Sequence, residues 1–259
     1  MVSPTSASRP RPALARPLDL TYPSNRAAAL GTLATVAVAR ARGRPWPDAL
    51  GTGAAAFLAW ATARELDPDH PVTANAALAV AAAATLPDRP VGLRPLLGAV
   101  AVLSGLRLTA GTTGQSTTRT DLVALLTQAL LAAGTGAPVA AAVAGAAPLL
   151  TPQDRSAVPL MGALLPAFTH AHAGSWRGAL LSAAALPLAG TLTAPEAVGS
   201  ACDRAPRTVR AAEVQRTRQV AVLALAAGLV ARQSRGLLPL AAACLTVAAR
   251  RAGADLKTE

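Results

Sequence analysis

Charge is missing from long stretches of this 259-residue chain. Residues 122–153 contain no Asp, Glu, Lys or Arg in 32 positions, and the same holds for 71–87, 156–176 and 178–195. A helix on the surface of a soluble protein carries charged side chains at helical spacing on its solvated face. The absence of such a face over so many turns favours helices that lie in a lipid bilayer.

Aromatic residues, lysine and cysteine are also scarce. The chain has three Trp, two Phe and one Tyr, and Lys257 is its single lysine. The net charge is +11, but no aromatic side chains lie between the arginines to stack nucleobases, so nucleic acid is not expected as a partner. The two cysteines, Cys202 and Cys244, lie in separate segments and predict neither a disulfide framework nor a thiolate metal site.

Apolar residues make up 52% of the chain, and its mean hydropathy is +0.39. These values predict an all-α protein, a polytopic transmembrane bundle of about eight to ten short Ala- and Leu-rich helices. Residues 1–25 form a Pro- and Arg-rich tail that we expect to be disordered, 26–250 form the helical domain, and 251–259 form a short polar tail.

Charged residues, prolines and glycines bound the expected spans. The spans are 27–39, 49–63, 71–87, 91–106, 122–150, 157–169, 176–192, 220–231 and 236–249. Residues 122–150 form either one kinked helix or a hairpin of two. A 13-residue helix is about 20 Å long, against about 30 Å of hydrocarbon, so flanking arginines must extend several spans toward the interface.

With ten spans, the side that carries both termini holds 16 basic residues and the opposite side holds 8. Basic residues favour the cytoplasmic side of a membrane, so we expect a multi-pass protein of the cytoplasmic (inner) membrane with both termini in the cytoplasm. We expect Thr193–Arg218 to form a short amphipathic or solvated helix at that surface. Its arginines would contact anionic lipid headgroups, and they are Arg204, Arg207, Arg210, Arg216 and Arg218.

The densest polar cluster lies between the second and third spans. It contains Glu65, Asp67, Asp69 and His70, whose oxygen and imidazole donors suit a divalent metal. The spacing matches no established metal motif, and a turn between two helices explains the same residues. Asp69 precedes Pro71 at an N-cap position, so we favour the turn and cap.

Two further segments are candidates for chemistry. His170 and His172 would join His70 in a metal site if the topology placed all three on one side, although solvated histidines are the simpler interpretation. The Gly- and Thr-rich segment Thr109–Asp121 offers hydroxyl groups that suit phosphate, but it lacks the P-loop pattern and is more typical of a connection. No cofactor or metal is expected.

The sequence therefore favours an integral membrane protein with a non-enzymatic structural or accessory role. A small-solute transporter or channel component is the first alternative, suggested by the number of spans and the prolines within them. A membrane-embedded metal-dependent enzyme that uses Arg64–His70 with His170 and His172 is the second. The oligomeric state is left open.

Overall fold

The computed structural model describes residues 12–16, 18–87, 92–151, 155–164 and 174–255. Across these ranges the chain is helical, with a single isolated bridge between Ala201 and Thr208, so the predicted all-α class is confirmed. The first six helices are α1 (Pro23–Ala41), α2 (Trp46–Leu66), α3 (Pro71–Thr85), α4 (Arg94–Ala110), α5 (Arg119–Gly134) and α6 (Pro138–Leu150). The remaining elements are α7 (Leu160–Ala163), α8 (Trp176–Ala185), the 3-10 turn η1 (Leu186–Leu188), α9 (Ala189–Thr193), α10 (Ala211–Val230) and α11 (Leu238–Asp255).

Local sequence explains where these helices begin. Proline occupies the first turn of α1, α2, α3, α4 and α6, where its missing N–H removes no hydrogen bond. A capping box opens α5, in which Thr118 accepts from the amide of Asp121 and Asp121 accepts from the amide of Thr118. Asp121 also accepts from the amides of Ala13 and Leu14, which fixes part of the segment that we expected to be disordered.

Several expected spans differ from the helices. Residues 122–150 form the hairpin of two, because Gly136 adopts a left-handed conformation (φ 76°) between α5 and α6. Pro187 lies within η1, between α8 and α9. Only Leu160–Ala163 of the expected span 157–169 is helical among its described residues, and 165–169 lie outside them. Among the described residues, no helix combines the length and hydropathy that crossing a membrane requires.

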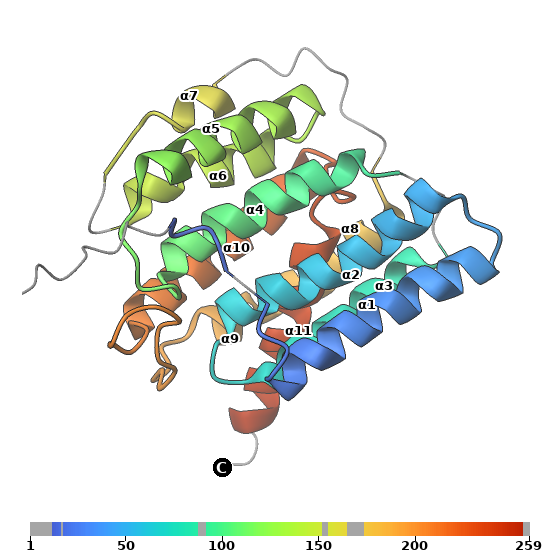
Figure 1. Cartoon of the computed structure of the whole chain (residues 1–259), viewed down its shortest axis with the longest axis horizontal. Helices are drawn as coiled ribbons and strands as arrows, with labels where there is room; N and C mark the ends of the chain where they lie inside the picture. Colours follow the sequence, from blue (N-terminus) through green and yellow to red (C-terminus); the bar gives the residue numbers. More distant parts are fainter. Residues whose placement is uncertain (1–11, 17, 88–91, 152–154, 165–173, 256–259) are drawn as a thin grey trace, which may run out of the picture.

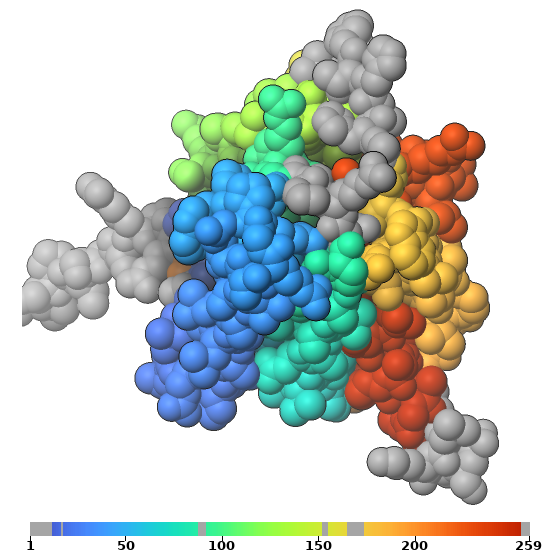
Figure 2. All heavy atoms as spheres, turned by 90° about the vertical axis from the view of Figure 1, so that its right-hand side faces the viewer, coloured from blue at the N-terminus to red at the C-terminus, as the bar shows by residue number. Residues whose placement is uncertain are grey.

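Successive long helices run up and down between two ends of the bundle, and Figure 1 shows α1, α2, α4 and α5 along one diagonal. We call one end the Glu65 end. At this end the α2–α3 and α4–α5 connections, residues 194–210 and the last turns of α11 lie together, and side-chain hydrogen bonds link them. We call the other the Asp48 end, where Asp48 accepts from the amide of Gly92 and Gln233 accepts from that of Val139. Figure 2 faces the α1–α2 connection and shows α1 to α3 near α8 and α11.

Small residues allow the helices to approach closely. Alanine supplies most of the buried apolar side chains. A Cβ atom on Gly105 of α4 would lie 2.7 Å from the carbonyl oxygen of Val143 on α6, so only glycine fits that crossing. Close backbone contact of this kind supports the core by packing where large apolar side chains are few.

Within the described ranges, charged residues lie at the two ends of the bundle and not between them. We call the intervening helical segments the charge-free belt. They are 27–39, 49–63, 71–85, 95–106, 122–134, 138–150, 178–193, 219–231 and 238–249. The chain enters and leaves at the Glu65 end, because Arg16 pairs there with Glu65 and Arg250 pairs with Asp67.

Candidate functional site

A cleft of about 540 Å³ opens at the Glu65 end. Its wall combines side chains from the segment before α1, from α2 and α4, and from the loop that precedes α10. Its basic residues are Arg16, Arg64, Arg107 and Arg204, and its aromatic residues are Tyr22, Phe57 and Trp60. The cleft therefore gathers three of the six aromatic side chains of the chain beside four guanidinium groups.

Glu65 organises the cationic wall. Its carboxylate is fully buried and accepts from the Nε of Arg107 at 2.7 Å, while Nη1 of Arg16 lies 3.4 Å away and the Thr112 hydroxyl donates to its other oxygen. Burial acts to raise the pKa of Glu65, but the charges of Arg107 and Arg16 hold it below its usual value. Glu65 is therefore ionised and fixes two arginines at the rim.

Arg64 also lines the cleft, but it does not pair with Glu65 as Arg107 and Arg16 do. Its guanidinium lies 5.8 Å from the ring centre of Trp60, and Nη1 lies 3.4 Å from the hydroxyl of Ser24. The Nε of Arg64 and the Nε1 of Trp60 are buried donors that have no acceptor in the described part of the chain. Buried donors normally have partners, so these two are unsatisfied in this conformation. Both are closed off from solvent, and an acceptor in the cleft would reach them only after the Arg64 or Trp60 side chain shifted.

Arg64 and Arg204 also carry positive charge that no ion pair in the described ranges balances. Arg204 donates to the backbone oxygen of Pro12, and Arg64 to Ser24. Burial and the nearby Arg16 lower the pKa of Arg64 from its ordinary value. An anion in the cleft would relieve both effects, because it would compensate the cations.

Helical spacing gives the cleft one apolar and one basic half. On α2, Phe57, Trp60 and Arg64 share a face, and seven residues of helix separate the first from the last by about 10 Å. On α4, Leu103 lies one turn before Arg107 on the same face. Both helices thus place apolar side chains toward the charge-free belt and arginines toward the end of the bundle.

The four predicted metal candidates of the α2–α3 turn do not converge. Glu65 holds the two arginines, Asp67 accepts from His70 and pairs with Arg250, and Asp69 accepts from the amides of Gly199 and Ser200. In the described ranges no group of three His, Cys, Asp or Glu side chains could hold a metal ion, and His170 and His172 lie outside these ranges.

The predicted turn is present, but the predicted cap is wrong. Pro71 does begin α3, whereas the N-cap residue is His70 and its side chain makes no capping hydrogen bond. Asp69 instead ties the turn to the loop before α10, and its bonds with Ser200 and Gly199 lower its pKa against the opposing effect of burial. The turn is therefore an anchor for distant parts of the chain.

The expected helix over Thr193–Arg218 is wrong for 194–210 and present only over 211–218, which begin α10. Residues 194–210 form an extended loop, and α10 begins at Ala211. Arg218 is buried and donates to the Leu66 carbonyl oxygen and to Glu196, which also accepts from Arg250 and Arg251. Burial opposes ionisation of Glu196, but hydrogen bonds from Arg250 and Arg218 lower its pKa to about 2. Arg218 thus braces the loop and is not available to a lipid surface.

Sequence reasoning missed the cleft because its wall comes from separate parts of the chain. Arg16, Arg107 and Arg204 are far apart in the sequence, and no motif links them. One signal was available: Phe57, Trp60 and Arg64 follow the i, i+3, i+7 spacing that places side chains on one helix face. The Thr109–Asp121 segment contributes only Thr112 to the cleft wall.

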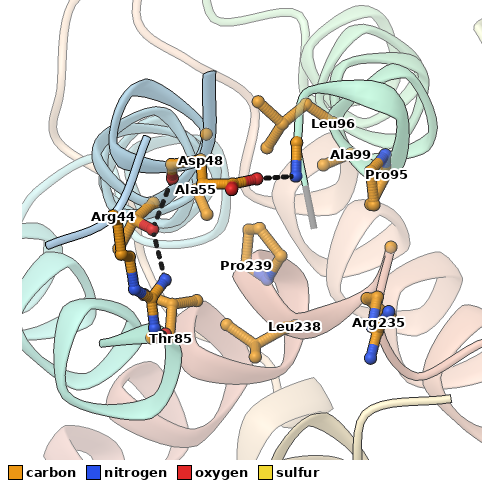
Figure 3. Close-up of a pocket in the computed structure, with 14 residues that line it drawn as sticks. Arg44, Asp48, Ala55, Thr85, Pro95, Leu96, Ala99, Arg235, Leu238 and Pro239 are labelled. Atoms are coloured by element: carbon orange, nitrogen blue, oxygen red, sulfur yellow. Dashed lines mark hydrogen bonds between the residues drawn. The ribbon is translucent and has the colours of Figure 1, made fainter. Parts of the chain in front are cut away.

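A second, smaller pocket of about 50 Å³ lies at the Asp48 end (Figure 3). Figure 3 shows Arg44 and Asp48 on one side and Arg235 on the other. Arg44 donates to Thr52 and to the carbonyl oxygens of Thr85 and Leu86, so it closes the ends of α1 and α3. This pocket suits a few water molecules, and the cleft at the Glu65 end is the larger candidate site.

Comparison of the chain with protein-family models, with curated proteins and with solved structures gave no significant match.

Proposed function

We propose that this protein is a non-enzymatic, membrane-embedded helical bundle that binds an anionic ligand in the cleft at its Glu65 end. The observation that carries the proposal is the pair of cleft-lining arginines, Arg64 and Arg204, which have no carboxylate partner in the described ranges. Guanidinium groups bind carboxylates and phosphates through charge-assisted hydrogen bonds, so an anion suits this wall.

The charge-free belt supports the membrane part of the proposal. Its outer surface carries large apolar side chains with exposed fractions of 67% at Leu30, 63% at Val123, 68% at Leu223 and 86% at Val230. Soluble proteins seldom expose such side chains around a whole girdle without interspersed charges. Lipid would cover this girdle, while the basic ends would lie among headgroups on both sides.

The length of three helices is compatible with a membrane crossing, although no described helix is also apolar enough to cross one by itself. Helices α1, α2 and α10 contain 19, 21 and 20 residues, which correspond to about 28–32 Å when their charged ends are included. Arginine side chains at those ends can reach the interface while their stems stay in contact with apolar surface. The excess of basic residues on the side of the termini favours the cytoplasm for the Glu65 end.

The ion pairs of Glu65 and the protonated thiol of Cys202 favour a non-enzymatic role. Glu65 is locked in ion pairs with Arg107 and Arg16 and is unsuited to proton transfer. Cys202 lines the cleft, but burial raises the pKa of its thiol and so disfavours the nucleophilic thiolate. The wall thus offers hydrogen-bond donors in place of an acid–base pair.

Tryptophan fluorescence tests anion binding directly, because Trp60 lies in the cleft wall and Trp46 and Trp176 belong to the first turns of helices at the Asp48 end. Titration of the detergent-purified full chain with inorganic phosphate should give a saturable change in emission. The Arg64→Gln variant should bind at least tenfold more weakly, whereas Arg26→Gln, which removes an exposed arginine outside the cleft wall, should bind as the parent does. Equal affinities for the parent and Arg64→Gln would refute the proposal.

A further inference from the structure

The residues that line the cleft indicate the chemical class of its ligand as well as the negative charge of that ligand. We infer that its ligand is a phosphate monoester attached to an apolar chain, as in the headgroup of a phosphorylated lipid. This inference rests on the proposed anion-binding function and adds the chemical class of the ligand.

The charge of the basic half suits a dianion. Four arginines and three carboxylates, Glu65, Asp19 and Asp203, line or anchor the wall, which leaves a formal charge of +1. Arg16 and Arg107 pair with Glu65 and Asp203, whereas Asp19 is exposed, so solvent screens its charge from the two remaining arginines. Arg64 and Arg204 remain without a carboxylate partner among the described residues. A phosphate monoester carries close to two negative charges at neutral pH, whereas a diester or a carboxylate carries one.

The donors of the basic half suit phosphate oxygens. A phosphate monoester presents three terminal oxygens, each able to accept more than one hydrogen bond. Arg64 and Arg204 both line the cleft, and the Nε of Arg64 and Nε1 of Trp60 are two further donors on α2 that a shift of these side chains would bring to the ligand. Arg64 can add a charged contact to whichever oxygens these donors bind, because its guanidinium is a planar fork of five N–H groups.

The apolar half suits a hydrocarbon chain. Phe57 and Trp60 stack obliquely with their ring centres 5.5 Å apart, and Leu18, Tyr22 and Leu103 complete this part of the wall. Phe57 and Trp60 precede Arg64 along α2, and Leu103 precedes Arg107 along α4, so these three side chains face the charge-free belt. Leu18 and Tyr22 belong to the segment before α1. A ligand that filled both halves would place its phosphate at the end of the bundle and its chain toward the belt.

A matched pair of ligands separates a lipid source from a soluble one. Glycerol 3-phosphate and dihexanoyl phosphatidic acid carry the same phosphate monoester on the same glycerol backbone and differ only in two acyl chains. Both are titrated into the detergent-purified full chain with Trp60 emission as the readout. The lipid should bind at least tenfold more tightly, because burial of even part of its acyl chains adds to the affinity.

Variants of the apolar wall distinguish cleft binding from uptake into the detergent micelle. Phe57→Gln should reduce the preference for the lipid at least fivefold while the affinity for glycerol 3-phosphate stays unchanged. Leu18→Gln, at a position that is already 40% exposed, repeats the test where folding is not at risk. Arg64→Gln should weaken binding of both ligands.

Different results would overturn the inferred ligand class and the proposed anion binding. Equal affinity for the two ligands, or a lipid preference that persists in both Phe57→Gln and Leu18→Gln, would overturn the inferred ligand class and leave anion binding intact. Failure of inorganic phosphate and glycerol 3-phosphate to bind at all would overturn the proposed function itself.

Discussion

Single residues determine the charge of the cleft, and Glu65 is the most consequential of them. Its buried carboxylate keeps Arg107 and Arg16 beside each other, and Thr112 satisfies its second oxygen. The interpretation of this turn from sequence, as a simple reversal with a cap, implied that Glu65 could be replaced with little effect. Its contacts imply the opposite, because removal of one member of a buried ion pair leaves an uncompensated charge.

We expect Glu65→Gln to lower the free energy of unfolding by about 3 kcal/mol, the typical cost of leaving a buried ion pair incomplete. Asp19→Asn, the same change at an exposed carboxylate, should alter it by less than about 0.5 kcal/mol. Denaturant unfolding in detergent measures both. Comparable stability of the two variants would show that the buried carboxylate does not hold the arginines together.

Glu196 predicts a dependence of stability on pH. Its pKa in the folded protein is about 2, below the ordinary value of 4.5, so its ionised form stabilises the fold above pH 4.5 and that contribution disappears as the pH falls toward 2. The stability difference between the parent and Glu196→Gln should therefore be large at pH 7 and should shrink between pH 4.5 and 2. A difference that is the same at pH 7 and pH 3 would contradict this assignment.

At the scale of helices, contact between α4 and α6 depends on Gly105. A Cβ atom there would meet the backbone of Val143, which cannot move aside as a flexible side chain can. Gly105→Ala should therefore destabilise the protein by about 1–3 kcal/mol, the usual cost of overpacking. Gly134→Ala is the matched control, since a Cβ at Gly134 meets nothing within 4 Å, and it should be neutral or slightly stabilising. Equal thermal stability of the two variants would argue against close packing of α4 on α6.

The helices were largely predictable because their boundaries are local. Charges, prolines and glycines bracket each apolar run, and the α5–α6 break at 135–137 follows from Gly136 and Pro138. The loop 194–210 was not predictable, because its course depends on Asp69 and on the three arginines that hold Glu196, all distant in sequence. The cleft could be anticipated only through the face of α2 that carries Phe57, Trp60 and Arg64.

At the scale of the whole molecule, charge is distributed in layers. Two basic ends enclose a belt whose helical segments carry no charged residue and whose outer surface is apolar. Alanine supplies most of the buried apolar side chains, and leucines such as Leu106, Leu125 and Leu240 are buried among them. Large apolar side chains also lie on the outside, at positions such as Leu30, Leu223 and Val230. Small residues at helix contacts and apolar side chains on the outer surface are compatible with a lipid environment.

The most direct test of this account is the retention of the protein by membranes. Membranes from cells that produce the full chain are washed with alkaline carbonate without detergent, and pellet and supernatant are assayed for the protein. The charge-free belt predicts that the protein stays in the pellet and is released only by detergent, because the apolar girdle would otherwise be exposed to water. Recovery of folded, monodisperse protein in the carbonate supernatant would contradict the membrane-embedded bundle.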